Sequence, residues 1–193
     1  GVSADVQAIE LERPDGTKVT HVVRRHGTAD WKPSEGDTAT SEHGVLTALA
    51  DAGLPVPRPL ALDTSCTRLP SPYLVLPFVH GTPDPPDLPR ALEAMAEFLA
   101  RLHALDPRTL HLPELPTCAD ALPEVLEYLP DRYGTLCARL ERSPPEPDPR
   151  TSLLHGDFWP GNVLWDASGL VAVIDWEDTA LWSPLADVAA CRS

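Results

Sequence analysis

Lysine and amide side chains are almost absent from this sequence. Its 193 residues include two lysines, Lys18 and Lys32, one glutamine and one asparagine, Asn162. Long apolar runs are also missing, and because a membrane-spanning helix needs ~20 consecutive apolar residues, no membrane segment is expected. Hydrophobic residues still make up 42% of the chain, which is enough for a folded core. Extended disorder is therefore excluded.

Basic residues are scarce relative to acidic ones. Fifteen Lys and Arg residues oppose 29 Asp and Glu residues, which gives a net charge of −14. Duplex nucleic acid and anionic membrane surfaces would be repelled, so neither is an expected partner. A cationic small molecule would be attracted, although an acidic surface also serves solubility alone.

Cysteines are few and widely spaced, with no C-x-x-C pair among Cys66, Cys118, Cys137 and Cys191. This spacing encodes neither a disulfide framework nor a zinc site, which suits a reducing cytoplasm, so the expected localisation is cytoplasmic. No charged and then apolar leader precedes the first expected strand, so we expect no signal peptide. The chain begins at Gly1 rather than Met and stops at Ser193 within a pattern, which indicates a fragment.

The first third of the chain has the alternating pattern of β-strands. Residues 6–11 and 18–25 alternate on either side of a turn sequence, which predicts a hairpin. A short amphipathic helix is expected after it, with Ser41 as the N-cap and Gly53 as the stop. A further strand is predicted over residues 73–79.

The composition changes to proline-rich and then helical after this strand. The chain has 23 prolines, more than twice the usual share of ~5%. Leucines at helical spacing from Leu92 onward predict a helix that Pro107 ends. After it we expect two shorter helices, over residues 119–129 and 132–142, and a proline-rich linker over residues 143–150. Three short strands are expected over residues 153–154, 163–165 and 170–174, and a tight turn joins the last two.

Side chains that could take part in catalysis or bind a metal are grouped near the end of the sequence. Asp157 follows a short apolar run, Asn162 lies five residues later beyond a Pro-Gly turn, and Asp175 ends the next run. Phosphoryl transfer needs a group that orients the nucleophile and metal ions that neutralise phosphate charge. A carboxylate can do the first, and amide and carboxylate oxygens are suitable ligands for Mg²⁺.

The spacing of these residues matches the catalytic loop of protein kinases, H-x-D-x-x-x-x-N. His155, Asp157 and Asn162 occupy its three positions, and the only asparagine of the chain fills the last of them. The alternative is that Asp157 and Asn162 simply stabilise a turn.

The sequences HGDFWPGN, VIDWED and PLADVA together resemble the aminoglycoside phosphotransferase family, which includes the choline-kinase-like small-molecule kinases. The resemblance implies an α+β, protein-kinase-like, two-lobed fold that is incomplete at both ends. Residues 1–76 would form a β-rich N-lobe, residues 77–81 a hinge, and residues 82–193 a mainly helical C-lobe. The catalytic loop would span residues 153–177, and the C-terminal helices that bind the acceptor in this family would be missing.

The resemblance also implies roles for individual residues. Asp157 would be the catalytic base or the group that orients the hydroxyl, while Asn162 and Asp175 would be the magnesium ligands. His155 would support the loop rather than react. Asp187, in PLADVA, would hold the catalytic loop or serve the structure alone.

Nucleotide binding needs a cation near the phosphates, and neither lysine lies at the expected strand position. Aligning the kinase strand motif with residues 21–24 puts Arg24 there, with Glu42 as its helix partner. Both could instead be solvated surface charges. Ser3 lies where a phosphate-covering loop is expected, and backbone groups of Pro77 and Val79 would read adenine if residues 73–81 are the hinge rather than an ordinary strand end.

The sequence therefore predicts an enzyme that transfers the γ-phosphate of ATP to a hydroxyl of a small molecule with Mg²⁺. GTP is compatible with the same pattern, and the acidic balance favours a cationic acceptor. Two alternatives remain: a nucleotide-binding pseudokinase or regulatory module, and a metal-dependent phosphohydrolase. Nothing in the sequence indicates the oligomeric state.

Overall fold

A computed structural model describes residues 4–27, 38–117, 134–142 and 151–191. The first part of the chain forms a four-stranded antiparallel sheet in the order β1-β2-β4-β3. Its strands are β1 (Ala4–Glu12), β2 (Lys18–His26), β3 (Ala61–Asp63) and β4 (Tyr73–Pro77). β1 and β2 pair as the predicted hairpin, and β2 lies between β1 and β4. β2 is thus an inner strand, and its side chains reach the interior of the molecule.

Helix α1 (Thr38–Asp51) packs against this sheet and buries one face. The prediction that Ser41 caps the helix was wrong, because the helix begins three residues earlier and buries Ala39 completely. The predicted stop is confirmed: Gly53 has a φ of +78°, and the amide of Leu54 donates back to the carbonyl of Leu49 at 3.0 Å.

The strand predicted over residues 73–79 is shorter than expected and ends at Pro77. His21 is the last β2 partner in this ladder, opposite Pro77. Beyond it the amide of Phe78 reaches only the carbonyl of Thr20, at 3.4 Å, and the chain then leaves the sheet. This exit carries the chain toward the second half of the molecule.

Helix α2 (Leu88–His103) is the longest helix among the described residues. It begins earlier than the leucine spacing predicted, because Asp87 caps it by accepting a hydrogen bond from the amide of Arg90. Met95, Phe98, Leu99 and Leu102 form its buried face. Leu92 fits the same spacing but is 55% exposed, so it lies outside this buried face.

The last third of the chain forms two small antiparallel pairs and two short helices. β5 (Ser152–Leu154) pairs with β8 (Ala180–Trp182), and β6 (Val163–Asp166) pairs with β7 (Gly169–Val173) in the predicted tight hairpin. The helices are α4 (Gly134–Arg142), inside the predicted range 132–142, and α5 (Leu185–Ala190). Short 3-10 turns lie at Pro107–Thr109 and Pro160–Asn162. The helix predicted over residues 119–129 and the linker 143–150 lie outside the described residues.

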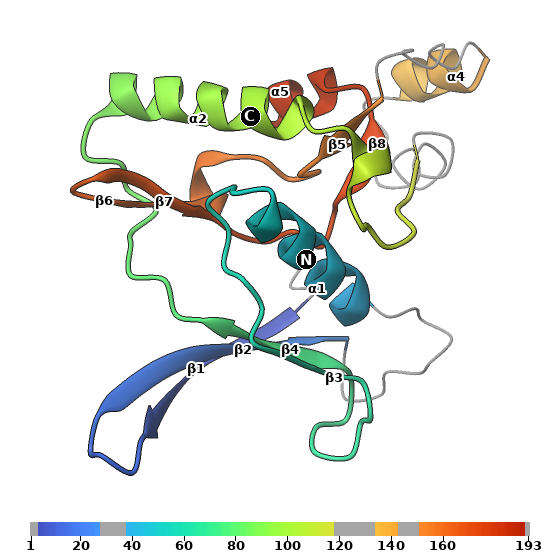
Figure 1. The fold of residues 1–193 in the computed structure, drawn as a ribbon. Helices are drawn as coiled ribbons and strands as arrows, with labels where there is room; N and C mark the ends of the chain where they lie inside the picture. Colours follow the sequence, from blue (N-terminus) through green and yellow to red (C-terminus); the bar gives the residue numbers. More distant parts are fainter. Residues whose placement is uncertain (1–3, 28–37, 118–133, 143–150, 192–193) are drawn as a thin grey trace.

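One hydrophobic core connects the two halves. Figure 1 shows the four-stranded sheet at the bottom and α2 at the top, with α1 and the β6–β7 hairpin between them. The core includes Leu46 and Leu74 from the first half together with Phe98, Leu153 and Trp176 from the second. The site described below lies in this middle layer.

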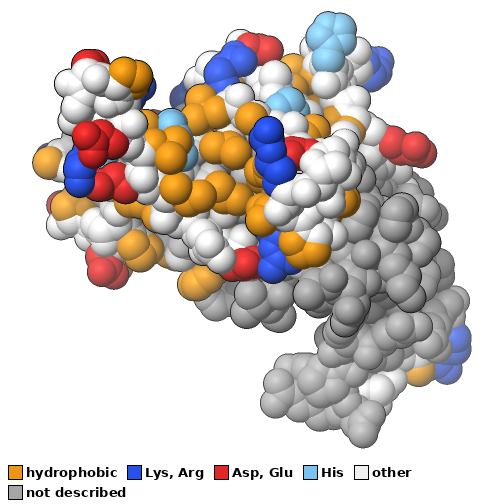
Figure 2. Space-filling model, turned by 90° about the horizontal axis from the view of Figure 1, so that it is seen from below, with side chains coloured by type: hydrophobic (Ala, Val, Ile, Leu, Met, Phe, Trp, Pro, Cys, Tyr) orange, Lys and Arg blue, Asp and Glu red, His pale blue; other side chains and the backbone are white. Residues whose placement is uncertain are grey.

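The outer face of the sheet is less well covered. Figure 2 shows hydrophobic side chains gathered on the face seen from below, and Ile9 and Leu11 of β1 are 39% and 50% exposed. Among the helices that the structure describes, none combines the length and the apolar composition required to cross a bilayer.

Candidate active site

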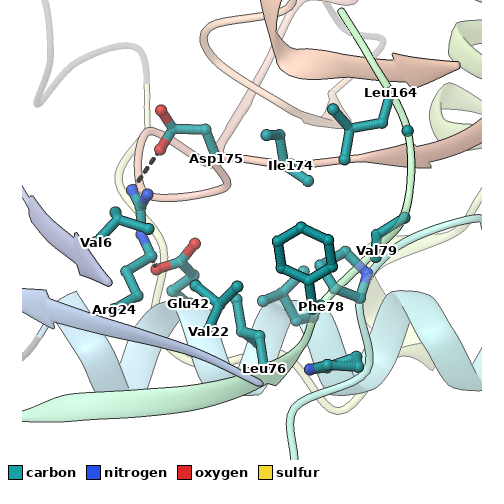
Figure 3. Close-up of a pocket in the computed structure, with 14 residues that line it drawn as sticks. Val6, Val22, Arg24, Glu42, Leu76, Phe78, Val79, Leu164, Ile174 and Asp175 are labelled. Atoms are coloured by element: carbon teal, nitrogen blue, oxygen red, sulfur yellow. Dashed lines mark hydrogen bonds and ion pairs between the residues drawn. The ribbon is translucent and has the colours of Figure 1, made fainter. Parts of the chain in front are cut away.

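A cavity of about 330 Å³ lies between the sheet and the β6–β7 hairpin. Apolar side chains line most of it, with Val22 and Leu76 on the sheet side and Leu164 and Ile174 on the hairpin side. Figure 3 shows Arg24, Glu42 and Asp175 at one end of this cavity and Phe78 and Val79 at the other. The cavity is thus an apolar slot with charged groups at one end.

The residues predicted to read adenine line this cavity. Pro77 ends β4, and Val79 lies just beyond it on the segment that connects the two halves. Their apolar neighbours provide two walls that suit a flat ring. Ser3, predicted to bind phosphate, lies outside the described residues.

The predicted partners Arg24 and Glu42 are brought together in the interior. The Nε of Arg24 donates to Oε2 of Glu42 at 2.9 Å, and the two side chains are 11% and 1% exposed. The idea that both are solvated surface charges is therefore wrong. Arg24 also donates through Nη2 to Oδ1 of Asp175 and, at 2.8 Å, to Oε2 of Glu177.

Two residues at this end of the cavity were missed by the sequence analysis, His26 and Glu177. Nε2 of His26 lies 2.7 Å from Oε2 of Glu42, and Nδ1 lies 3.5 Å from Oε2 of Glu177. Burial lowers the pKa of His26, but hydrogen bonds to Glu177 and Glu42 outweigh it, so the pKa lies above its ordinary value. The strand alternation that puts residues 24 and 26 on one face was the available signal for His26.

Asp157 and Asn162 are also in contact, across the turn that separates them. Nδ2 of Asn162 donates to the backbone carbonyl of Asp157 at 2.9 Å and to its Oδ2 at 3.1 Å. Asn162 is 7% exposed, whereas Asp157 is exposed. Because the amide nitrogen is used in this way, Oδ1 of Asn162 is the atom suited to a cation.

Asn162 and Asp175 are neighbours through the β6–β7 hairpin. The amide of Ile174 donates to the carbonyl of Asn162 at 2.9 Å, which brings Asp175 next to Asn162. Asp175 has a φ of +69°, a left-handed backbone that turns the chain away after β7. Burial raises the pKa of the Asp175 carboxyl, and although Arg24 opposes this, the negative charge of Glu177 adds to it.

These two residues fit Mg²⁺ as part of a larger ligand set. Among the described residues, no three His, Cys, Asp or Glu side chains are grouped so as to hold a metal by themselves. Mg²⁺ is commonly bound by one or two protein oxygens together with waters and phosphate oxygens. The amide oxygen of Asn162 and the carboxylate of Asp175 are such a pair, and a protein-only metal site is not indicated.

His155 connects the loop to the hairpin. It is fully buried; Nε2 donates to the carbonyl of Ile174 at 2.9 Å, and Nδ1 accepts from the amide of Asp157 at 3.2 Å. These two roles require the neutral imidazole, and burial lowers the pKa of His155 accordingly. The contacts are those that a supporting role requires.

Asp187, on α5, holds the backbone just before Asp157. Its carboxylate accepts hydrogen bonds from the amides of His155 and Gly156, both at 3.0 Å. Nε2 of His103, at the end of α2, lies 2.9 Å from the same carboxylate. Asp187 is fully buried, so three donors compensate its charge.

An aromatic side chain covers the turn between Asp157 and Asn162. Trp159 is 46% exposed, and its ring lies against Gly161, where an added Cβ would come within 2.3 Å of it. The amide of Asn162 donates to the carbonyl of Trp159 at 3.0 Å. The close approach of indole and backbone is possible because position 161 has no side chain.

Comparison with known proteins gives a family match over almost the whole chain. The model described as the phosphotransferase enzyme family matches residues 4–193.

Solved phosphotransferases have the same fold. A thermostable mutant of aminoglycoside phosphotransferase APH(4)-Ia, in complex with ADP and hygromycin B, has a TM-score of 0.66 at 22% identity, over 95% of this chain and 70% of that one. For the GDP and kanamycin complex of APH(2″)-IIIa the TM-score is 0.63 at 21% identity, over 95% and 70%. For macrolide 2′-phosphotransferase MphH from Brachybacterium faecium it is 0.61 at 20% identity, over 95% and 66%. The expected kinase-like α+β fold is thereby confirmed.

Curated relatives are much longer proteins. Acyl-CoA dehydrogenase family member 10 of Mus musculus is 28% identical over 209 residues, which cover 96% of this chain and 18% of that protein. Family member 11 of Homo sapiens is 24% identical over 192 residues, which cover 88% and 24%. The chain spans about a fifth of the length of these relatives.

Proposed function

The chain belongs to the phosphotransferase enzyme family, and from this premise we propose that it transfers the γ-phosphate of ATP to a hydroxyl of a small molecule. The observation that carries the proposal is the meeting of Asp157, Asn162 and Asp175 beside an apolar slot that has Arg24 at its charged end. Phosphoryl transfer depends on positioning and charge neutralisation, and these groups supply both.

The slot supports binding of a purine nucleotide. Val22, Leu76 and Leu164 would contact the base, while Pro77 and Val79 would offer it backbone groups. Arg24 would face the phosphates. The solved relatives named above bind ADP or GDP, which supports a nucleotide for this chain as well. ATP is the proposed donor, and competition between ATP and GTP would measure the preference.

Magnesium would be held by Oδ1 of Asn162 and the carboxylate of Asp175. When bound, the ion would neutralise charge on the phosphates during transfer. Arg24 balances part of the negative charge of Asp175, Glu42 and Glu177. This end of the slot therefore combines a fixed guanidinium with carboxylates.

Asp157 would act on the acceptor. Asp157 is exposed. Nδ2 of Asn162 donates to both its backbone carbonyl and its Oδ2, which holds the carboxylate in place. The acceptor hydroxyl oxygen would form the new bond to the γ-phosphorus while the bond between that phosphorus and the β–γ bridging oxygen breaks. ADP leaves with the bridging oxygen, and Asp157 accepts the hydroxyl proton. The acidic balance of the chain supports a cationic acceptor.

Substitution of Asp157 tests this function. The protein is incubated with labelled ATP·Mg²⁺ and a panel of aminoglycosides, macrolides, amino alcohols and sugars, beside D157A. Because general-base catalysis contributes about 10²–10⁴-fold, D157A should lose product formation by that factor and keep nucleotide binding. D84A, which removes an exposed aspartate outside the site, should behave as wild type.

Two results would contradict the proposal. Nucleotide-dependent thermal stabilisation without product from any acceptor favours a binding module that lacks catalysis. Release of phosphate from phosphate esters without ATP favours a hydrolase.

A further inference from the structure

The charged end of the slot is a closed ring of four side chains, which we call the Arg24 ring: Arg24, His26, Glu42 and Glu177. Arg24 and His26 each contact both carboxylates. Arg24 reaches Oε2 of Glu42 at 2.9 Å and Oε2 of Glu177 at 2.8 Å, and His26 reaches the same two atoms at 2.7 and 3.5 Å. The ring joins β2, α1 and the segment after β7, which lie far apart in the sequence.

The ring is buried, and its two carboxylates are matched in charge by Arg24 and the protonated form of His26. The side chains of Glu42 and Glu177 are 1% and 13% exposed, and that of His26 is 6% exposed. Arg24 additionally holds Asp175, so among the contacts of the described residues the loss of His26 would leave Glu42, Glu177 and Asp175 around one guanidinium. Carboxylates crowded in this way in a buried site repel one another and move apart or bind a proton. Either change would alter the direction of the guanidinium.

Two of the three guanidinium nitrogens of Arg24 are held by carboxylates. Nε is bound to Glu42, and Nη2 is bound to Glu177 and Asp175. Nη1 makes no hydrogen bond to any residue that the structure describes. Because the guanidinium is planar, fixing Nε and Nη2 also fixes where Nη1 points.

We propose that His26 is a positioning residue for nucleotide phosphate binding: by holding the Oε2 atoms of Glu42 and Glu177, it fixes the guanidinium of Arg24 in its orientation toward the slot. This inference rests on the proposed function, since it needs a nucleotide in the slot. His26 touches no phosphate and acts through Arg24. A lysine ammonium carries its three donors on one freely rotating atom and has no planar fork whose direction could be fixed, so the ring also accounts for the use of arginine on β2.

Binding measurements with two probes test this role. Calorimetry gives the dissociation constants of AMP-PNP·Mg²⁺ and of adenosine, which lacks phosphates, for wild type, H26A, H26Q and H111A. Since a hydrogen bond to a charged group contributes a factor of about ten or more, H26A should weaken AMP-PNP binding about tenfold and leave adenosine binding within about twofold. H26Q keeps one donor toward Glu42 and should lose less. H111A removes an exposed histidine and should match wild type.

A double-mutant cycle separates positioning from a structural role. Because His26 acts through Arg24, H26A should have no further effect on AMP-PNP binding in an R24A background. Equal losses for AMP-PNP and adenosine, or a full H26A effect in R24A, would overturn the proposal. If H26A does not fold, H26Q decides the question by the same comparison. If the wild-type protein binds neither probe, the proposed function itself is contradicted. That outcome differs from failure of the His26 proposal, in which the wild type binds both probes.

Discussion

Backbone geometry at single residues shapes the loop around Asp157. Gly156 has a φ of +90°, and a Cβ at this position would lie 2.0 Å from the carbonyl oxygen of Asp178. Gly161 admits the ring of Trp159, and Asp175 takes up a left-handed backbone after β7. The loop that carries Asp157 is therefore positioned by close contacts that other residues would not allow.

Replacement of Gly156 with alanine should lower activity about 100-fold. The added Cβ meets backbone rather than a flexible side chain, so the segment of residues 155–157 must move, and a shift of about 1 Å at reacting groups costs about 100-fold in rate. Steady-state kinetics and thermal unfolding of G156A measure the loss. G169A is the matched control, because Gly169 also has a positive φ but no atom within 4 Å of an added Cβ. Equal effects of the two variants would show that backbone strain, not the contact, matters.

His26 should make stability dependent on pH. The pKa of His26 in the folded protein lies above the ordinary value of 6.5, because Glu177 and Glu42 outweigh burial and the nearby Arg24. Its contribution to stability is therefore fully present below about pH 6.5 and is lost as pH rises through the folded pKa. The difference in free energy of unfolding between wild type and H26A should shrink as pH is raised from 6 to 9. Urea denaturation at several pH values measures it, and a constant difference would refute the assignment.

At the scale of elements, two helices meet behind the loop that carries Asp157. The end of α2 supplies His103 and α5 supplies Asp187, and the carboxylate receives the amides of His155 and Gly156. Ser152 of β5 adds a contact to the carbonyl of His103 at 3.3 Å. This arrangement ties α2, α5 and the loop into one unit.

Removal of the Asp187 carboxylate should loosen this unit. D187A leaves the amides of His155 and Gly156 and the ring of His103 without their acceptor, and disruption of a buried charged partner costs about 3 kcal/mol. H103A leaves both amide contacts in place and should cost less. Chemical denaturation of both variants checks the order. A loss for H103A equal to that for D187A would mean that the histidine, not the amide pair, dominates.

Sequence patterns were informative where the determining interactions are local. The hairpin of residues 6–25, the Gly53 stop and the Asp157-to-Asn162 spacing depend on neighbours within about five residues or on strand alternation. β8 and the start of α1 were not predicted, because β8 is paired with β5 and the first turn of α1 is stabilised by burial of Ala39.

The missed site residues show the same limit. Glu177 contacts Arg24 across 153 positions of sequence, and His26 meets Glu42 from another element. Composition and spacing carry no information on such contacts. Asn162 was predictable as a site residue because it occupies a position in a short sequence motif. Its hydrogen bonds to Asp157 could be identified only in the folded turn.

At the scale of the whole molecule, one core spans the sheet and the helical half. Phe98 of α2 stacks on Phe158 with ring centres 5.6 Å apart and lies 6.2 Å from Trp176. The same core contains Leu46, from α1. The two halves should therefore unfold together.

Truncation of Phe98 tests this coupling. F98A removes a ring that is 3% exposed and should lower the free energy of unfolding by about 3–5 kcal/mol. Circular dichroism and tryptophan fluorescence should report a single transition with the same midpoint. L92A, which truncates an exposed side chain of the same helix, should stay within about 0.5 kcal/mol of wild type. Two separate transitions would mean that the halves are independent.

The contact of Trp159 with Gly161 has an optical consequence. Trp165 and Trp176 are almost fully buried, whereas Trp159 is half exposed on the turn between Asp157 and Asn162. An indole in such a position changes its emission when its hydration changes. The protein thus carries an intrinsic fluorophore on the turn beside Asp157. Under the proposed function, acceptor binding beside this turn should change the emission and can be followed without an added label.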